Sequence, residues 1–210
     1  ITHSETYLFM EQPVRALNET LRAEMRRFLN EIPPDQIERE SLIVNQKVIE
    51  SERYRTSKRI SVYISKQRAE ISTKSIIYDI FSKEKLCYVP RWTGASMEMV
   101  KLNSLQDYLS LEDSVDELGF PTLDNQEREI ATQLDLIIIP GMAYDLDGNR
   151  LSYNREDPYN EYLAKCERWK SPPKIMALAL DGQILRDGNV PVTDENRKPH
   201  IILSPSQDIW

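Results

Sequence analysis

Residues 134–151 read LDLIIIPGMAYDLDGNRL, and the order of apolar and turn-forming residues in this stretch sets the plan of the fold. Its first six residues, 134–139, are the most apolar run of the chain, which predicts a buried strand near the centre of a sheet. Further on, Asp147-Gly148 is typical of a tight turn within a hairpin. The stretch therefore predicts a central strand followed by a hairpin.

The segments on either side alternate between helical and strand periods. Residues 14–30, 72–83 and 159–169 predict helices, and Pro33-Pro34 ends the first of them, so that Asp35 can cap another helix that runs to about residue 50. Residues 97–102 and 200–203 predict short strands, and residues 103–133 an irregular, acidic surface excursion. The strand–helix–strand order predicts one α/β domain in three layers, with residues 59–65, 86–89, 134–139 and 174–180 in one mostly parallel sheet flanked by helices.

Composition limits the classes of function. A chain of 210 residues with 40% hydrophobic residues can bury one ample core, so we expect a single domain over residues 14–203, an N-terminal extension 1–13 and a C-terminal tail 204–210. The formal net charge of −7 argues against a general nucleic-acid surface. No apolar run approaches the roughly 20 residues that span a bilayer. His3 and His200 are too few and too separate for a metal site.

Several blocks of the sequence occur in the same order, with the same gaps, as in one enzyme family. They are SKRISVYIS (57–65), IIYDIFSKEKLCYVPRW (76–92), MEMVKL (97–102) and PGMAYDLDGNRL (140–151). From about residue 14 to residue 203, the chain resembles the 5-formyltetrahydrofolate cyclo-ligase family. The resemblance implies an α/β fold and the use of ATP and Mg²⁺ to make 5,10-methenyltetrahydrofolate. It also implies that ATP phosphorylates the formyl oxygen, that the neighbouring nitrogen attacks, and that phosphate leaves.

Five positions match functional residues of the family. Arg22 matches an arginine that holds ATP phosphates, and Arg150 matches the arginine before the family's glycine-rich loop. Glu70 matches the glutamate that contacts folate, Thr73 matches its usual companion, and Asp145 matches the aspartate after Pro-Gly. A carboxylate suits the paired N–H groups of a pterin. Asp145 and Arg150 also have a simpler explanation, because an aspartate at the entrance of a hairpin makes ordinary turn hydrogen bonds.

Other positions depart from the family's pattern. Asn18 replaces a phosphate-binding lysine, although Arg15 lies on a nearby face of the same helix, and Asn160 replaces the aspartate that binds Mg²⁺. The loop 152–158 has no glycine, so its backbone amides cannot approach phosphates as a glycine loop does. Arg155 can reach a phosphate, but one cation does not replace a cradle of amides. Asn196 and His200 stand where the family usually has two further aspartates.

These losses predict a catalytically inactive relative that serves as an accessory subunit of a larger protein assembly, because catalysis by positioned charge does not survive the loss of most of its parts. The ATP site is then degenerate and no cofactor or metal is expected. Partners are other protein subunits, with folate as a further ligand and no membrane insertion. The apolar ends, 1–13 and 204–210, are candidate docking segments.

Two alternatives stay open. The first is a working, ATP- and Mg²⁺-dependent cyclo-ligase with an unusual nucleotide loop, and the second is a folate or nucleotide sensor without turnover. The chain starts at Ile1 rather than Met, which fits a cleaved mitochondrial presequence or an incomplete chain equally well. Between a mitochondrial and a cytoplasmic location, the first is slightly favoured.

Overall fold

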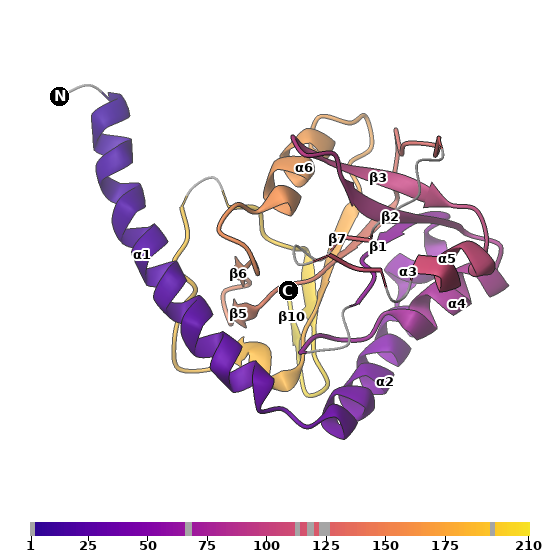
Figure 1. Ribbon diagram of the computed structural model, residues 1–210, viewed down its shortest axis with the longest axis horizontal. Helices are drawn as coiled ribbons and strands as arrows, with labels where there is room; N and C mark the ends of the chain where they lie inside the picture. Colours follow the sequence, from indigo (N-terminus) through magenta and orange to yellow (C-terminus); the bar gives the residue numbers. More distant parts are fainter. Residues whose placement is uncertain (1–2, 66–68, 112–113, 117–119, 122–126, 194–195) are drawn as a thin grey trace.

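A seven-stranded sheet runs through the centre of the described part of the computed structural model, which covers residues 3–65, 69–111, 114–116, 120–121, 127–193 and 196–210 (Figure 1). The strand order is β10-β9-β7-β4-β1-β2-β3. Their bounds are β1 (Arg59–Val62), β2 (Leu86–Trp92), β3 (Met97–Leu102), β4 (Leu136–Ile139), β7 (Lys174–Leu178), β9 (Ile201–Leu203) and β10 (Asp208–Ile209). Neighbours from β9 to β2 pair in parallel, whereas β10 and β3 pair antiparallel at the two edges. The predicted mostly parallel sheet is confirmed.

Strand β4 lies in the middle of this sheet and is buried on both faces. Leu136 and Ile138 belong to one hydrophobic cluster, whereas Ile137 and Ile139 belong to the cluster on the opposite face. Successive side chains of a strand point to opposite faces, so an unbroken apolar run is stable only where both faces are covered. The burial of all four side chains confirms the prediction of a central strand.

Helices cover the two faces of the sheet and make it the middle of three layers. Helices α2 (Pro34–Glu50), α4 (Lys74–Ser82) and α5 (Leu105–Leu111) share the first hydrophobic cluster with one face. Helix α6 (Pro158–Cys166) packs on the other face through Tyr159, Tyr162 and Leu163. A short helix, α3 (Glu52–Thr56), links α2 to β1. The three-layer α/β architecture follows from these two separate cores.

A small sheet beside the large one carries the predicted hairpin. Its strands are β5 (Ala143–Asp145), β6 (Arg150–Leu151) and β8 (Ile184–Leu185), in the order β6-β5-β8, and the 3₁₀ turn η1 (Asp181–Gln183) precedes β8. Gly148 has φ +79°, a left-handed conformation that suits the tight turn between β5 and β6. Helix α1 (His3–Asn30) packs on this sheet, because Met25 and Leu29 share a core cluster with Leu151. The small sheet thereby fixes α1 next to the hairpin.

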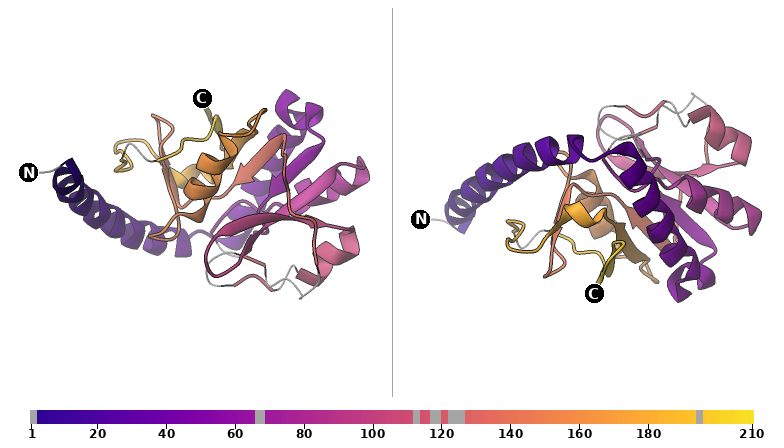
Figure 2. Two further views of the ribbon diagram at one scale, coloured as in Figure 1. Left: turned by 90° about the horizontal axis from the view of Figure 1, so that it is seen from above. Right: turned by 90° about the horizontal axis from the view of Figure 1, so that it is seen from below.

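The amino-terminal part of the fold differs from the expectation in two ways. Helix α1 begins at His3 rather than near residue 14, so residues 3–13 extend the helix, and its amino-terminal end projects from the rest of the domain (Figure 2). The side chains of residues 1–11 lie outside the described part of the chain. Asp35 does not cap α2, because the helix begins at Pro34 and Pro33 is its N-cap residue. Asp35 instead pairs with Arg39 within the first turns.

The carboxyl-terminal residues 204–210 return to the sheet through strand β10 and do not form a free tail. Strand β10 pairs with β9, and Ile209 is 9% exposed. The ammonium of Lys47 donates to the backbone oxygen of Ser204 (2.7 Å) and to the carboxylate of Asp208 (2.8 Å). Among the apolar side chains of this segment, Trp210 is largely exposed, with the guanidinium of Arg53 5.1 Å from its ring centre. These contacts correct the prediction of a free docking segment at this end.

Two further observations concern the middle of the chain and its relation to membranes. The segment 103–133 contains helix α5, so the expected irregular excursion is partly helical. None of the helices in the described residues combines the length and the apolar character needed to cross a bilayer.

Candidate functional site

The predicted site residues approach one another at the edge of the sheet where the parallel strands β1, β4 and β7 end. The chain leaves β4 at Ile139 and passes through Gly141 into the β5–β6 hairpin. A Cβ atom at Gly141 would lie 2.6 Å from the hydroxyl oxygen of Tyr144 and 3.0 Å from Cγ of Arg150, so the position requires glycine. This close approach lets Nη1 of Arg150 donate to the backbone oxygen of Pro140 (3.1 Å). In open α/β sheets, ligands bind at this edge.

Asp145 is fully buried, and both of its carboxylate oxygens accept hydrogen bonds from the hairpin or from Val190. Its Oδ1 accepts hydrogen bonds from the backbone N–H groups of Asp147 (3.1 Å) and Asn149 (2.8 Å). Its Oδ2 accepts from the side-chain amide of Asn149 (2.8 Å) and from the backbone N–H of Val190 (2.9 Å). The carboxylate therefore closes the turn and ties Val190 to it. This agrees with the simpler explanation for Asp145, ordinary turn hydrogen bonds at the entrance of the hairpin.

Thr73 and Glu70 follow β1, and neither lines the cavity formed by the arginine residues described below. Thr73 is fully buried, and its hydroxyl donates to the backbone oxygen of Tyr63 (2.6 Å). Glu70 lines a separate cavity of about 340 Å³ beside α2, together with Asn45 and Tyr108. Burial above all, and the nearby Glu70 carboxylate, raise the pKa of Tyr63 well above its ordinary value. The structure does not bring Glu70 into the same cavity as Arg22 and Arg150.

Four arginines line a second, polar cavity of about 140 Å³, which we call the arginine cavity. Arg15 and Arg22 come from α1, Arg150 from β6, and Arg155 from the loop that follows. Asn18, the replaced lysine position, lines it as well. The helical turn of α1 places Arg15, Asn18 and Arg22 on one face of the helix, and the packing of α1 on the small sheet brings that face to the hairpin. Such a group of guanidinium side chains favours an anion.

Arg22 is held rigidly within this cavity. It is 5% exposed, and its Nε donates to the backbone oxygen of Ser152 (2.9 Å). Its Nη1 pairs with Glu19 of the preceding turn (3.0 Å). Burial lowers the pKa of Arg22, while Glu19 raises it. A guanidinium that has already lost its water and its rotamer freedom binds an anion at a smaller entropic cost.

Arg150 and Asp157 form an ion pair at the base of the arginine cavity. The side chain of Arg150 is 3% exposed, and one of its nitrogens, Nη2, donates to Oδ2 of Asp157. The guanidinium also lies 5.9 Å from the ring centre of Tyr159. Among the described residues, Nε of Arg150 and Oδ1 of Asp157 are buried without a hydrogen-bond partner. The ion pair therefore leaves one donor and one acceptor unused beside the cavity.

The two substituted positions, Asn18 and Asn160, make structural contacts. The side-chain amide of Asn18 donates to the backbone oxygen of Pro191 (3.1 Å) and so ties α1 to the segment after β8. Oδ1 of Asn160 accepts from the backbone N–H of Arg197 (2.6 Å). These contacts give both asparagines a reason to be present that is unrelated to phosphate or metal.

The other two substituted positions lie near the carboxyl terminus. Asn196 lines the arginine cavity, and its side-chain oxygen accepts from the backbone N–H of Thr193 (2.7 Å). His200 is outside the cavity, and its Nδ1 accepts from the backbone N–H of Ile175 (3.0 Å). Burial lowers the pKa of His200 below its ordinary value of 6.5, which favours the neutral form that this hydrogen bond requires.

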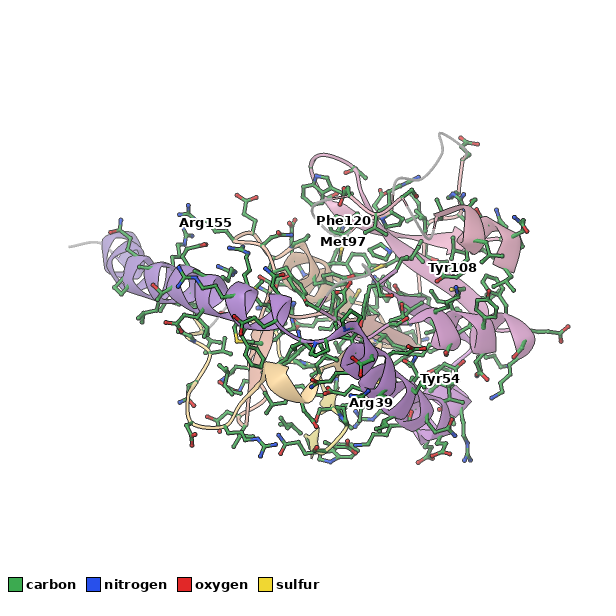
Figure 3. All side chains as sticks on the ribbon, turned by 60° about the horizontal axis from the view of Figure 1, so that its bottom comes forward. Arg39, Tyr54, Met97, Tyr108, Phe120 and Arg155 are labelled. Atoms are coloured by element: carbon green, nitrogen blue, oxygen red, sulfur yellow. The ribbon has the colours of Figure 1, made fainter. Side chains whose placement is uncertain are left out.

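A wider cavity of about 580 Å³, the aromatic cavity, adjoins the arginine cavity. The rings of Trp92 and Phe120 line it and stack on each other, with centroids 6.0 Å apart and an interplanar angle of 20°. Glu161 and the loop 154–158 complete the lining, so Arg155 and Asp157 border both cavities. Figure 3 shows Arg155 above α1, and Phe120 beside Met97 of the β2–β3 hairpin. The loop after β6 therefore separates a cationic cavity from an aromatic one.

Sequence reasoning assigned no role to Trp92 or Phe120 and only a minor one to Arg15. A local signal existed for Trp92, which lies at the end of β2 just before Gly94, a glycine with φ +89° in the β2–β3 turn. An aromatic side chain beside a hairpin turn is often exposed to a ligand. The signal for Phe120 is weaker, because only its position after Gly119 marked a turn.

The sequence was also compared with known proteins. The family model described as "5-formyltetrahydrofolate cyclo-ligase family" matches residues 14–205. A mouse 5-formyltetrahydrofolate cyclo-ligase is 36% identical over 195 residues, which cover 90% of this chain and 94% of the mouse protein. A mitochondrial 5-formyltetrahydrofolate cyclo-ligase from Arabidopsis thaliana is 27% identical, over 89% of this chain and 73% of its own length.

Solved structures agree with the fold. The NMR structure of 5,10-methenyltetrahydrofolate synthetase from Aquifex aeolicus superimposes with a TM-score of 0.72 at 20% identity, over 91% of both chains. A 5,10-methenyltetrahydrofolate synthetase from Mycoplasma pneumoniae gives a TM-score of 0.67 at 14% identity, over 90% of this chain and 98% of the other. At these identities, the likeness establishes the shared α/β fold.

The prediction of a catalytically inactive accessory subunit is wrong. It is overturned by the 36% identity to a mouse protein named as the enzyme, over nearly the whole of both chains. The physical reason is that the losses were counted along the sequence, without the cations that folding brings beside them. The structure instead places Arg15 and Arg155 in the same cavity as Arg22 and Arg150, so positive charge is present where a lysine and a glycine loop are missing. The chain belongs to the 5-formyltetrahydrofolate cyclo-ligase family.

Proposed function

We propose that this chain is an active, ATP-dependent 5-formyltetrahydrofolate cyclo-ligase. The observation that carries the proposal is that the arginine cavity and the aromatic cavity share two lining residues, Arg155 and Asp157. One cavity suits a polyphosphate and the other suits a ring system. A phosphoryl group held in the first cavity can therefore pass to a substrate held in the second.

The nucleotide site uses side chains where the family uses loop amides. The loop 152–158 lacks glycine, and Pro158 has no N–H group to donate. Four guanidinium groups supply donors instead, two of them buried at the base and two exposed at the rim. A guanidinium binds a phosphate through two parallel hydrogen bonds and keeps its charge at any physiological pH. In this proposal, the charge of the four guanidinium groups compensates for the backbone amides that a glycine loop would supply.

The folate derivative occupies the aromatic cavity. Its volume of about 580 Å³ lies within the roughly 300–1000 Å³ of typical small-molecule sites. Trp92 offers a flat apolar surface for a ring, and Phe120 supports it from behind by stacking. The predicted contact of Glu70 with folate stays a prediction, since that carboxylate lines a different cavity.

The reaction requires the arginines to stabilise charge during phosphoryl transfer. The formyl oxygen attacks the terminal phosphorus of ATP and ADP leaves; the neighbouring nitrogen then attacks the formyl carbon, loses its proton and expels phosphate. Negative charge is spread over the oxygens of the transferred group in such a transition state. Arg155, at the border of the cavities, faces that group. Arg22 and Arg150, which are fixed by their bonds to Ser152 and Pro140, hold the other phosphates without reorganising.

The residues present fit a divalent cation only as a complex with the nucleotide. Within the described residues, no group of three or more His, Cys, Asp or Glu side chains is placed to hold a metal. Mg²⁺ usually needs only one or two carboxylates together with substrate phosphates. Asp157 is a carboxylate that lines the arginine cavity, so its side chain could supply such a ligand. Bound there, Mg²⁺ would neutralise part of the phosphate charge.

Two expectations from the sequence stay untested. We expected no cofactor, but the proposed activity requires ATP and Mg²⁺ as the family does. We also favoured mitochondria slightly over the cytoplasm. The Arabidopsis relative is named as mitochondrial, but for this chain the location stays a prediction.

The proposal is tested by following methenyltetrahydrofolate formation by its absorbance, with the purified chain, 5-formyltetrahydrofolate, ATP and Mg²⁺. We expect turnover between about 1 and 1000 per second. The variant Arg155→Met should lower kcat by about 100-fold, because it removes one charged group that faces the transferred phosphoryl.

Arg39→Met is the matched control. Arg39 is an exposed arginine on α2 that lines neither cavity, and its pair with Asp35 is open to solvent. The control should turn over like the unchanged protein. An unchanged protein that forms no methenyltetrahydrofolate above the rate without enzyme would show that the proposed function is wrong.

A further inference from the structure

Ser152 is the first residue of the loop between β6 and α6, and it lines the arginine cavity. It is 8% exposed, and its hydroxyl has a partner on each side. The hydroxyl accepts a hydrogen bond from Nη2 of Arg22 (3.4 Å) and donates to the backbone oxygen of Asn154 (2.6 Å). Its backbone oxygen accepts from Nε of Arg22 (2.9 Å). Ser152 therefore connects a buried arginine to the peptide bond that follows Asn154.

This peptide bond sets the direction in which Arg155 leaves the loop. The oxygen of Asn154 and the backbone nitrogen of Arg155 belong to the same peptide unit, which is planar. A hydrogen bond to that oxygen therefore orients the backbone of Arg155 as well. The side chain of Arg155 is exposed and has several free torsion angles, so its reach depends on where the backbone places its first atoms.

The loop is also held on both sides of Arg155. The hydroxyl of Tyr153 donates to the backbone oxygen of Ala69 (3.2 Å), a residue 84 positions away. On the other side, Asp157 pairs with Arg150. Positions 153 and 157 each lie two residues from Arg155, a distance of at most about 7 Å along an extended chain. The loop is thus fixed around Arg155, and the serine hydroxyl acts on the short span between these two points.

We propose that Ser152 is a positioning residue for phosphoryl transfer, because its hydroxyl fixes the backbone before Arg155 and holds that guanidinium at the border of the arginine and aromatic cavities. Arg22 and Arg155 then form one connected unit. An arginine that is already in place does not have to be reoriented in the transition state, so the hydroxyl contributes to kcat more than to nucleotide binding. This inference rests on the proposed function, because it assigns a role within the same nucleotide site.

The experiment removes the hydroxyl with Ser152→Ala. It measures kcat, and by calorimetry without the folate substrate it measures the dissociation constant of MgATP. We expect kcat to fall about tenfold, because a small displacement of a charged group is costly in the transition state. The dissociation constant of MgATP should change by about twofold or less, which separates a positioning residue from a direct phosphate contact.

A double variant tests whether Ser152 acts through Arg155. Ser152→Ala combined with Arg155→Met should have the kcat of Arg155→Met alone, since the hydroxyl then has nothing to position. Two independent contributions would multiply to a loss of about 1000-fold. Circular dichroism and a thermal scan check that each variant folds.

Ser57→Ala is the matched control. Ser57 is 5% exposed, and its hydroxyl also donates to a backbone oxygen over 2.6 Å, that of Arg53. It lines neither the arginine cavity nor the aromatic cavity. The control should keep the kcat of the unchanged chain, although it loses a buried hydroxyl of the same kind.

A second measurement does not depend on activity. A nitroxide spin label is attached to Glu156→Cys, an exposed position next to Arg155, and the two natural cysteines, Cys87 and Cys166, are buried. Without ligands, the electron paramagnetic resonance lines should be narrower with Ser152→Ala than with Ser152 present, because the loop then moves more freely. Equal line shapes would contradict the inference.

The outcomes separate the two proposals. If Ser152→Ala keeps its kcat, mainly weakens MgATP binding, or lowers the kcat of Arg155→Met by a further tenfold or so, the inference is wrong and the proposed function stands. If the unchanged chain shows no turnover, the proposed function is wrong, and the line shapes alone decide whether Ser152 holds the loop.

Discussion

At the scale of single residues, a carboxylate in this fold acts according to the groups that surround it. Asp145 and Asp157 both lie close to Arg150 in the sequence, but Asp145 accepts three hydrogen bonds from the hairpin and one from Val190. Asp157 accepts a charged hydrogen bond from Arg150 at the arginine cavity. The first therefore closes the turn of the hairpin, and the second holds a cavity arginine in place.

Asp145→Ala tests the structural role. The substitution leaves four N–H donors, three in the hairpin and one at Val190, without their acceptor, so we expect a loss of about 2–5 kcal/mol in the free energy of unfolding. Asp147→Ala in the same turn is the control, because Asp147 is exposed and contributes only its backbone N–H to this network. Urea unfolding of both variants gives the comparison, and equal losses would contradict the assignment.

At the scale of elements, the carboxyl-terminal strand completes the large sheet. Strand β10 covers the outer edge of β9, which would otherwise present unpaired backbone groups. Its position is secured from α2 by Lys47, which reaches both Ser204 and Asp208. Residues 208–209 are therefore a part of the folded domain, and Ile209 needs no partner protein to become buried.

The variants Ile209→Ala and Trp210→Ala compare a buried and an exposed apolar side chain that are neighbours in the sequence. Ile209 is 9% exposed and packs in the core cluster of α6, so truncation should cost about 2 kcal/mol of unfolding free energy. Trp210 is 78% exposed, and its truncation should have little effect. Both are measured by urea unfolding. A larger loss at Trp210 than at Ile209 would show that β10 is not docked as described.

At the scale of the whole molecule, the site depends on how three parts of the chain meet. Helix α1 projects from the domain at its amino end and crosses the small sheet with its carboxyl half (Figures 1 and 2). That contact brings Arg15 and Arg22 to the hairpin, while the loop before α6 adds Arg155. A ligand that bridges these parts should stabilise the domain as a whole.

Thermal unfolding with ligands tests this expectation. At about 100 times its dissociation constant, a ligand adds about 2.7 kcal/mol to the free energy of unfolding. For a chain of this size, that corresponds to a rise in Tm of about 5–10 °C. We expect such a rise with MgATP and with 5-formyltetrahydrofolate. Arg155→Met should reduce the rise caused by MgATP, and Arg39→Met should not. Unchanged melting of the original protein with both ligands would contradict a shared site.

Local patterns were sufficient for the fold. The period of two in residues 59–65, the apolar run at 134–139 and the helical periods between the strands all predicted elements that the structure contains. Their order led to a parallel sheet, because short right-handed crossovers leave few other arrangements. The errors lie at the ends, where α1 begins earlier and residues 208–209 form an edge strand. Short end segments show little hydrophobic periodicity, and whether they form a helix or a strand depends on the surface against which they pack.

The site could be predicted only in part. Arg22 and Arg150 were identified by resemblance and Arg155 by its reach toward a phosphate, and the structure places the three in one cavity. Glu70 and Thr73 were identified in the same way but lie elsewhere at the sheet edge. Trp92 and Phe120 were missed, because their ring contact joins residues 28 positions apart through a long connection.

The sequence determines those properties that depend on consecutive residues: strand and helix periods, the hairpin turn at Gly148, and the family to which the chain belongs. The number of cations around the nucleotide site is a property of the folded chain. It is set when Met25 and Leu29 dock α1 on the small sheet, which moves Arg15 next to Arg150 although 135 positions separate them. Charge acts through distance in space rather than along the chain, so the loss of one lysine and of the loop glycines could be judged correctly only after folding had brought the arginines together.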